Sequence, residues 1–376
     1  MKISVTAKLE NSQLLSDRTL WIAIFALLAA GLVMVYSSSF IFALERYKDG
    51  LYFFKRHLIF GSIGVGAFII GLKIPLKKLQ QLSFAFVAAT AVLLVCALIP
   101  GLSHRAGGAS RWINLFGFTL QPAEIAKFAV ILFVANQLAK KSETQANFTT
   151  GFLTYFIPVI PIYLLLLTQP DFGTFALLIC ATFCMLFGAG IKLRYLLTTV
   201  ALAVPLAVAL IFTSPYRKAR VLGFLDPWSD PAHKGFQVIQ SFLAFYSGKW
   251  LGVGLGNSKE KLFYLPEAHN DFIFAVVGEE LGLFGVLFFV SLFLIVVMRG
   301  LTVAKKAQDT FQRSLAIGIS TLIGLQAFFN MAVVLGLLPT KGLPLPLISY
   351  GGTSLITTLF ILGVLTQLSE RSEQSA

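Results

Sequence analysis

Charged side chains are scarce in this chain of 376 residues. Asp, Glu, Lys and Arg make up only 12% of it, against about 25% in a typical soluble domain. Apolar residues reach 57%, and the mean hydropathy is +0.81. A water-soluble globule of this length cannot hide so much apolar surface. The composition therefore excludes a soluble enzyme, a disordered chain and a coiled coil, and it predicts an all-α polytopic membrane protein.

Cysteine is nearly absent, with three residues in the whole chain. Cys96, Cys180 and Cys184 all fall inside apolar runs. Two thiols on one helix face, without histidine or further cysteine nearby, make a poor metal site. The sequence therefore excludes a disulfide framework, and these thiols are expected to act as small buried apolar groups.

Acidic residues are too few to balance the basic ones, and the net charge is +13. The Lys and Arg residues do not form one basic tract. They stand in short clusters between apolar runs, as at Lys140-Lys141 and Lys305-Lys306. Clusters of this kind are typical of the loops that flank membrane spans. We therefore expect no nucleic-acid partner.

The apolar runs are long enough to cross a membrane about ten times, at about 20 residues for each span. A polar lead, 1–20, precedes the first run, and no small-residue cleavage site follows that run. A retained first span is therefore predicted, not a cleaved signal peptide. The ten candidate spans are about 21–44, 57–74, 79–100, 123–139, 151–168, 172–190, 194–213, 271–299, 313–337 and 345–368.

An even number of spans places both termini on the same side of the membrane. The short segments on that side carry more Lys and Arg than those on the other side, which predicts a cytoplasmic lead 1–20 and a cytoplasmic tail 369–376. Segment 214–270 is then a large extracytoplasmic loop before the eighth span. Its stretch GFQVIQSFLAFYSG is expected to form an amphipathic helix on the membrane surface. The whole chain, 1–376, is expected to form a single integral-membrane domain.

Polar residues at the outer ends of the fourth and sixth spans need an explanation, because charge at a membrane edge is costly. Glu124 and Lys127 are three residues apart and share a helix face, just after Arg111 in the preceding loop. They form either a self-neutralising ion pair or a polar wall of an outward-facing cavity. Asp171 either caps the sixth span or pairs with Lys127 across the bundle.

A second group of polar residues lies just before the eighth span. Glu267, His269 and Asp271 fall within five residues of one another. A helix cap alone does not require all three. Because Glu279 and Glu280 follow about two turns deeper, segment 271–280 is expected to be a half-buried helical lead into the span.

A third group lies before the tenth span, in the stretch PTKGLPLPLISYGGTS, 339–354. Its prolines and glycines predict irregular backbone, which is tolerated at membrane depth only beside protein or a water-filled cavity. Lys341 in this stretch, with Arg217 in the large loop, supplies positive charge on the outer side. Together these groups suit an anionic, lipid-linked substrate held at the outer leaflet.

These motifs resemble those of the SEDS family of bacterial cell-wall proteins, which includes FtsW, RodA and SpoVE. The resemblance covers about residues 20–368, and the stretch around Lys341 is more similar to FtsW than to RodA. The residues that carry it are RWI at 111–113, QPAE at 121–124, QPDFGT at 169–174, PEAHNDFIFA at 266–275, EELG at 279–282 and PLPLISYGG at 344–352.

The resemblance implies a peptidoglycan glycosyltransferase that polymerises lipid II at the outer face of the bacterial cytoplasmic membrane during cell division. Asp271 falls on the family's essential aspartate, whose proposed role is general base or ligand of a divalent cation, Mg²⁺ or Mn²⁺. No other cofactor is expected. The implied partners are a class B penicillin-binding protein and other divisome or elongasome membrane proteins.

The remaining site residues receive supporting roles under this resemblance. Positively charged groups suit the leaving lipid pyrophosphate, and the other polar side chains line, brace or shape the cavity. A lipid II flippase and a non-catalytic scaffold for a septal penicillin-binding protein remain open as alternatives. The expected substrate-binding residues are Arg111, Glu124, Lys127, Asp171, Arg217, Glu267, His269, Lys341, Ser349 and Tyr350.

Overall fold

The computed structural model describes residues 17–106, 109–115, 118–140, 155–212, 221–231, 235–261, 268–340 and 342–374. This part of the chain is mostly helical, as expected. The helices are α2 (Arg18–Tyr47), α3 (Tyr52–Lys73), α4 (Leu76–Cys96), α5 (Pro122–Lys140), α6 (Ile160–Thr168), α7 (Phe172–Gly188), α8 (Leu193–Phe212), α10 (Phe236–Gly248), α11 (Ile273–Lys306), α12 (Thr310–Val334) and α13 (Gly352–Gln374), with short 3₁₀ turns at Ile157–Val159 and Pro227–Ser229.

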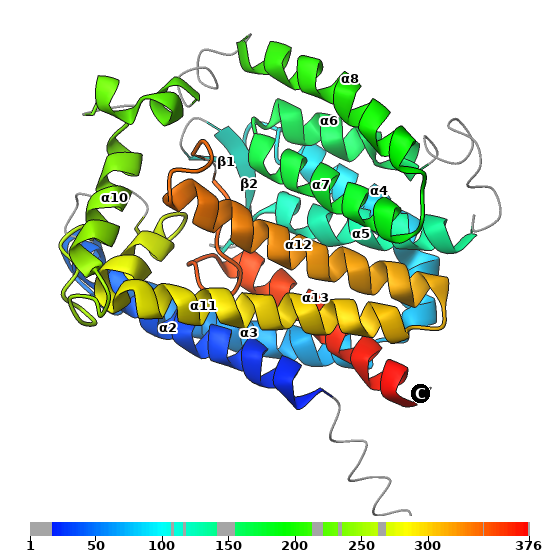
Figure 1. Cartoon of the computed structure of the whole chain (residues 1–376), viewed down its shortest axis with the longest axis horizontal. Helices are drawn as coiled ribbons and strands as arrows, with labels where there is room; N and C mark the ends of the chain where they lie inside the picture. The colour runs from blue at the N-terminus through cyan, green and yellow to red at the C-terminus, as the bar shows by residue number, and fades with distance from the viewer. Residues whose placement is uncertain are drawn as a thin grey trace, which may run out of the picture.

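Each of the ten expected spans overlaps a helix in this set, although α6 begins only at Ile160 and α13 only at Gly352. Within the described residues, seven helices are long and apolar enough to cross a membrane, while α6 and α7 are apolar but shorter. The chain is therefore a polytopic membrane protein. Figure 1 shows the long helices lying side by side, with α10 at one end of the bundle and the C-terminus at the other.

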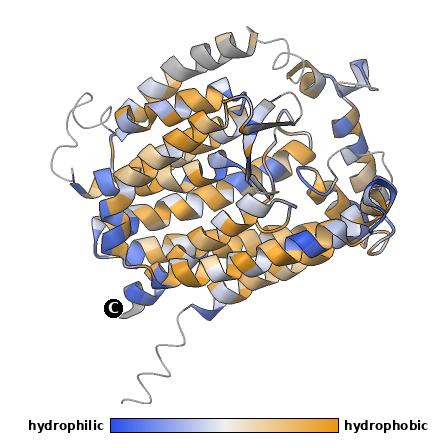
Figure 2. Cartoon of the chain, turned by 180° about the vertical axis from the view of Figure 1, so that it is seen from behind, coloured by the Kyte–Doolittle hydropathy of each residue, from blue (hydrophilic) through white to orange (hydrophobic). Residues whose placement is uncertain are grey.

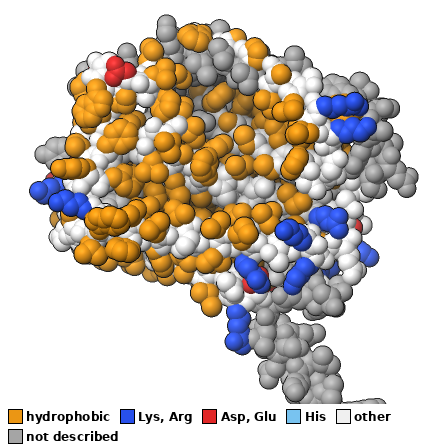
Figure 3. All heavy atoms as spheres, in the orientation of Figure 1, with side chains coloured by type: hydrophobic (Ala, Val, Ile, Leu, Met, Phe, Trp, Pro, Cys, Tyr) orange, Lys and Arg blue, Asp and Glu red, His pale blue; other side chains and the backbone are white. Residues whose placement is uncertain are grey.

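The outside of the bundle is apolar, as a bilayer requires. Figure 2 shows apolar residues along the helices and polar residues at their ends. In Figure 3 apolar side chains cover the middle of the visible face, and Lys and Arg gather at its two ends. Helix α5 lies at the centre, because 83% of its most apolar window is buried inside the protein.

Close helix packing depends on glycine where α3 meets α13. A Cβ on Gly71 would lie 2.4 Å from the carbonyl oxygen of Phe360, and a Cβ on Gly363 would lie 2.2 Å from that of Phe68. Small residues let membrane helices approach until their backbones touch, so that van der Waals contact holds them together. Helix α13, which follows the irregular stretch 342–351, is in this way fixed against α3.

A small antiparallel sheet between α4 and α5 was not part of the prediction. Strands β1 (Ser103–Ala106), β2 (Ala109–Leu115) and β3 (Phe118–Leu120) pair in the order β1-β2-β3. These strands are short, and their sequence has no clear alternation of apolar and polar residues, so the period-2 signal is weak. Strand β2 of this sheet carries Arg111.

Helix α11 contains the predicted lead. Residues Ile273–Glu280 are all buried, and the helix is interrupted at Gly282, where φ is 62° and ψ is −160°. A Cβ at this position would lie 2.4 Å from the backbone nitrogen of Gly252. Glycine is required because the backbone is left-handed there and the large loop packs directly against it. The expected helical lead is present from Ile273 to the break at Gly282, but Ile273–Glu280 are fully buried and not half-buried as predicted.

The expected amphipathic helix is also present, as α10, and it packs against the lead of α11. The ring centroids of Phe245 and Phe274 are 6.1 Å apart, and a Cβ on Gly248 would lie 1.9 Å from the carbonyl oxygen of Gly278. The loop before α11 is therefore not a loose tether but a packed part of the molecule. Its position on the membrane surface stays a prediction.

Candidate active site

Four separate segments meet around Gly342, at the end of the bundle opposite the C-terminus. They are strand β2, the turn between α6 and α7, the residues before α11, and the irregular stretch before α13. A Cβ on Gly342 would lie 3.3 Å from Oδ2 of Asp271 and 3.6 Å from Nη1 of Arg111. The carboxylate and the guanidinium therefore reach the same point, and the missing side chain of Gly342 leaves them room to do so.

The main chain around Asp271 is held by residues from two other segments. The hydroxyl of Ser349 donates to the carbonyl oxygen of Asn270 at 2.7 Å, and the backbone N–H of Tyr350 donates to the carbonyl oxygen of His269 at 3.0 Å. The amide of Asn330 donates to the carbonyl oxygen of Asp271 itself at 2.7 Å. Three successive carbonyl groups are thus fixed, and the partly buried side chain of Asp271 is held on a rigid backbone.

Arg111 is anchored by main-chain carbonyl groups. Its Nε donates to the carbonyl oxygen of Gln169 at 3.1 Å, and its Nη2 donates to that of Pro170 at 2.5 Å. Among the described residues, no carboxylate oxygen lies within ion-pair distance of it. A guanidinium has five N–H donors, so Nη1 and its charge stay free to act near Gly342. The arrangement suits recognition of a phosphate.

Asp171 caps a helix and does not pair with Lys127. Its Oδ1 accepts a hydrogen bond from the backbone nitrogen of Thr174 at 3.2 Å, and its Oδ2 accepts one from the hydroxyl of Thr174 at 2.8 Å. The carboxylate therefore satisfies the N-terminus of α7, where negative charge is favoured. The cross-bundle ion pair was the wrong alternative, because Lys127 already has a nearer partner.

That partner is Glu124, one turn earlier on α5. Nζ of Lys127 lies 2.6 Å from Oε2 of Glu124, and both side chains are at most 3% exposed. Lys127 also donates to Oε1 of Gln326 at 2.8 Å, and Nε2 of Gln326 donates to the carbonyl oxygen of Pro344 at 2.8 Å. The self-neutralising pair is therefore present. It braces the stretch before α13 from behind and does not line an open surface.

His269 and Tyr350 belong to an aromatic cluster beside Asp271. The ring centroid of His269 lies 4.6 Å from that of Phe53 and 5.4 Å from that of Phe42. The ring of Tyr350 packs edge-on against Phe53, with centroids 4.9 Å apart. These contacts tie α2 and α3 to the segment that carries Asp271, so both residues shape the wall of the site.

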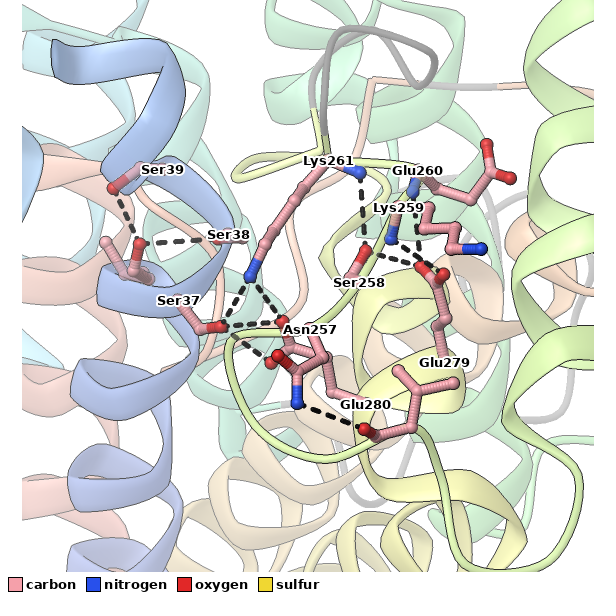
Figure 4. A network of polar contacts seen from close by, with 12 residues as sticks. Ser37, Ser38, Ser39, Asn257, Ser258, Lys259, Glu260, Lys261, Glu279 and Glu280 are labelled. Atoms are coloured by element: carbon pink, nitrogen blue, oxygen red, sulfur yellow. Dashed lines mark hydrogen bonds and ion pairs between the residues drawn. The ribbon is translucent and has the colours of Figure 1, made fainter.

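A second polar cluster surrounds Glu279 and Glu280 (Figure 4). Nζ of Lys261 lies 2.7 Å from Oε1 of Glu280, and the hydroxyl of Ser37 donates to the same carboxylate at 2.6 and 2.7 Å. Glu279 accepts hydrogen bonds from the hydroxyl of Ser258 and from the backbone nitrogen of Lys259, the latter at 2.9 Å. We call Ser37, Lys261 and Glu280 the clasp, because they join α2, the large loop and α11.

Glu260 lies next to the clasp, outside the membrane-spanning segments. Its pKa is raised to about 7, first by burial and then by the negative charge of Glu279. Desolvation and a neighbouring like charge both disfavour the ionised carboxylate. This part of the loop therefore changes charge near neutral pH.

Three predicted site residues, Arg217, Glu267 and Lys341, lie outside the described residues. Sequence reasoning did not single out Asn330 and Gln326 as site residues. Two amides four residues apart in an otherwise apolar span were the available signal, because a buried amide in a membrane helix needs hydrogen-bond partners. Within the described residues, no three His, Cys, Asp or Glu side chains gather as a metal cluster.

Comparison with known proteins identifies the family. Residues 18–374 match the family model for FtsW, RodA and SpoVE, which is described as "Cell cycle protein". The chain belongs to this family. The SEDS resemblance inferred from the motifs is thus confirmed, and with it the assignment as a multi-pass inner-membrane protein.

Several family members are similar over almost their entire length. The probable peptidoglycan glycosyltransferase FtsW of Geobacter metallireducens is 47% identical over 94% of this chain and 95% of its own. The protein of the same description from Pseudomonas fluorescens is 42% identical over 92% of this chain and 86% of its own. Both relatives are named FtsW, in agreement with the resemblance of the stretch around Lys341 to FtsW.

Solved structures agree with this fold. One comes from a study described as "Structural coordination of polymerization and crosslinking by a peptidoglycan synthase complex". Its matching chain is 28% identical, with a TM-score of 0.78 over 96% of this chain and 99% of that one. The rod shape determining protein RodA of Thermus thermophilus is 25% identical, with a TM-score of 0.68 over 95% and 97% of the two chains.

Proposed function

We propose that this protein polymerises lipid II into glycan strands at the outer face of the cytoplasmic membrane during cell division. The observation that carries the proposal is the convergence of Asp271 Oδ2 and Arg111 Nη1 on Gly342, in a family member nearly half identical to probable FtsW glycosyltransferases. A base and a phosphate-binding cation at one point are what transfer from a lipid pyrophosphate requires.

Asp271 acts as the general base in this proposal. An acceptor sugar hydroxyl forms a bond to the anomeric carbon of the donor, and its proton passes to the Asp271 carboxylate. The bond between the anomeric carbon and the pyrophosphate oxygen breaks, and its electron pair leaves with the lipid pyrophosphate. The hydrogen bonds on residues 269–271 hold the carboxylate in place, so little reorganisation is needed at the moment of reaction.

Arg111 stabilises the leaving group. Negative charge develops on the pyrophosphate as the glycosidic oxygen leaves, and a fixed guanidinium offsets it. The two carbonyl contacts of Arg111 orient its free Nη1 toward the site without neutralising its charge. Arg217 and Lys341 are proposed to add positive charge from their neighbouring segments.

A divalent cation fits this site in one arrangement. Asp271 would supply one carboxylate, and the substrate would supply phosphate oxygens, which is a common way of binding Mg²⁺. Mn²⁺ accepts the same oxygen ligands. When bound, such an ion offsets charge on the pyrophosphate. The protein's own steps, proton removal and orientation of the leaving group, stay with Asp271 and Arg111.

Both termini are proposed to lie in the cytoplasm, which places the site outside. Helices α3, α5, α11 and α13 each end in a turn that contains Lys or Arg, and α2 begins at Arg18 near the C-terminal end of the bundle (Figure 1). Positive charge at this end is typical of the cytoplasmic side. Residues 111, 171, 271 and 342 all lie at the other end.

A penicillin-binding protein is the proposed partner. The similar chain from the peptidoglycan synthase study belongs to a complex of polymerisation and crosslinking. By analogy, this protein would make glycan strands that a class B penicillin-binding protein crosslinks, alongside other division proteins. Large extracytoplasmic elements such as α10 are available for such contacts.

A lipid II flippase is less well supported. A flippase requires polar groups along the membrane depth, and Glu279 and Glu280 were the deeper candidates. Both carboxylates are buried and hydrogen-bonded within the protein, Glu280 to Ser37 and Lys261, and Glu279 to Ser258 and backbone nitrogens. They therefore support the loop and do not mark a path for a headgroup.

The test is polymerisation by the purified full chain with its cognate penicillin-binding protein, labelled lipid II and a divalent cation. Glycan-length gels should show long chains for the wild type and none for folded Asp271→Ala. Absence of chains from both, with an active partner and an intact fold, would contradict the proposal. A lipid II translocation assay on the same samples would then test the flippase.

A further inference from the structure

Asn330 connects two segments of the site that are far apart in the sequence. It lies near the end of α12 and is 2% exposed. Its Nδ2 donates to the carbonyl oxygen of Asp271 at 2.7 Å and to that of Leu343 at 2.8 Å. Because both neighbours are carbonyl oxygens, only the nitrogen of the amide can face them, which fixes the orientation of the side chain.

The two carbonyl groups belong to the residues whose spacing defines the site. Asp271 carries the carboxylate, and Leu343 directly follows Gly342, the point on which the carboxylate and Arg111 converge. One nitrogen atom therefore holds the main chain of Asp271 against the main chain of Leu343, on the other side of the site. The bond to Leu343 is buried and the bond to Asp271 is partly buried, so a lost partner is costly there.

We propose that Asn330 is a positioning residue for Asp271: its amide sets the place of the carboxylate relative to Gly342 and Arg111. The inference rests on the proposed function, since it assigns Asn330 a part in that same reaction. Asn330 does not touch the reacting atoms in this account. It acts through the backbone of Asp271.

Gln326 makes the effect of Asn330 separable from collapse of the loop. It lies one turn earlier on the same face of α12, and its Nε2 holds the carbonyl oxygen of Pro344 at 2.8 Å. Without the Asn330 amide, the stretch before α13 keeps this anchor and also the bonds of Ser349. The carbonyl group of Asp271 loses the bond that ties it to α12. The Asp271 carboxylate is therefore the group that is displaced.

The chain offers a matched control in Asn136. This residue is 5% exposed, and its Nδ2 donates to the hydroxyl of Ser83 at 2.7 Å, which joins α5 to α4. It lies near the Lys140 end of α5, whereas the site lies beyond the Pro122 end. Asn136→Ala therefore removes a buried interhelical amide bond of the same kind without touching the segments of the site.

The experiment compares the full-length wild type, Asn330→Ala and Asn136→Ala, each with the cognate penicillin-binding protein and labelled lipid II. We expect kcat to fall about 10- to 100-fold for Asn330→Ala, the size of effect that a small misplacement of a catalytic group produces. KM for lipid II should stay unchanged. Asn136→Ala should keep the wild-type kcat, although both variants unfold at lower temperature.

Equal activity of the two variants, or a loss that follows their thermal stability, would overturn the inference. A wild type that makes no glycan would instead remove the proposed function, and the inference would fall with it. The two failures are therefore distinguishable in one set of reactions.

A second variant decides the matter if Asn330→Ala does not fold. Asn330→Asp keeps the size of the side chain, but its ionised form cannot donate to either carbonyl. Its protonated form can donate one hydrogen bond. We expect the ratio of its kcat to that of the wild type to rise as the pH is lowered. A ratio that does not change with pH would contradict the positioning role.

Discussion

Lys261 and Glu280 form a buried ion pair, with 2.7 Å between Nζ and Oε1 and side chains that are 4% and 0% exposed. Lys261 lies in the large loop and Glu280 in the lead of α11, just before the break at Gly282. Ser37 of α2 donates to the same carboxylate. The clasp thus fixes the first turns of α11, which begins at Ile273, two residues after Asp271. Removing a clasp contact should therefore lower the free energy of unfolding.

We predict that Lys261→Met lowers the free energy of unfolding by about 3–5 kcal/mol, because it leaves the Glu280 carboxylate buried without its counter-ion. Thermal or denaturant unfolding of the purified protein in detergent measures the change. Lys259→Met is the matched control, since the Lys259 side chain is exposed and its contact to Glu279 uses the backbone nitrogen. Equal effects of the two substitutions would show that the clasp contributes nothing.

The charge of Glu260 predicts a pH dependence. Its folded pKa of about 7 exceeds the ordinary value of 4.5, so ionisation favours the unfolded chain. The contribution of the protonated Glu260 carboxyl to the free energy of unfolding is fully present below pH 4.5, and it is lost as the pH rises through about 7. Glu260→Gln should therefore match the wild-type unfolding temperature at pH 4.5 and exceed it at pH 8. A difference that is the same at both pH values would contradict the assignment.

Arg111→Lys should reduce polymerisation although it keeps the charge. A lysine cannot hold the carbonyl groups of Gln169 and Pro170 together while presenting a further donor near Gly342. We expect a loss of about 1–3 kcal/mol in transition-state binding, which is about 5- to 160-fold in kcat/KM. Initial rates at several lipid II concentrations measure it. Wild-type kcat/KM would show that positive charge alone is enough.

Ser349→Ala should destabilise the site because it removes two hydrogen bonds at once, one buried and one partly buried. The Ser349 hydroxyl donates to the carbonyl oxygen of Asn270 and accepts from the backbone nitrogen of Leu345. Two unsatisfied backbone groups cost about 1–3 kcal/mol each, so both unfolding temperature and rate should fall. Thr366→Val is the control, because this buried hydroxyl bonds only within its own helix, to Leu362. A similar response of both variants would argue against a specific role for Ser349.

Much of the fold could be predicted from the sequence, because a bilayer imposes a simple requirement. A run of about 20 apolar residues can satisfy its backbone only as a helix, and a helix lies within each such run here. The lead into α11 was also predictable, because Glu279 and Glu280 are too polar for the span that follows. Strands β1–β3 were not, because they are short and lack regular alternation.

The sequence predicted which segments form the site, but it did not predict which side chains in them pair with one another. Motif residues such as Asp271 and Arg111 stand out because charge at a membrane edge is rare. Which carboxylate pairs with Lys127 depends on distances that only the packed helices define, and the answer was Glu124 and not Asp171. Asn330 was overlooked because the two amides of α12 indicate only that partners are needed and not which carbonyl groups they will meet.

In the proposed reaction, Asp271 removes the proton from the acceptor hydroxyl. Asp271→Asn is the sharpest test of this role, because this substitution keeps the size of the side chain and the backbone contact to Asn330 but removes the base. Wild type and variant should show the same unfolding temperature and be compared by glycan-length gel with labelled lipid II and the cognate partner. We predict long chains from the wild type and none from Asp271→Asn. Chains of equal length and amount from both would contradict the account.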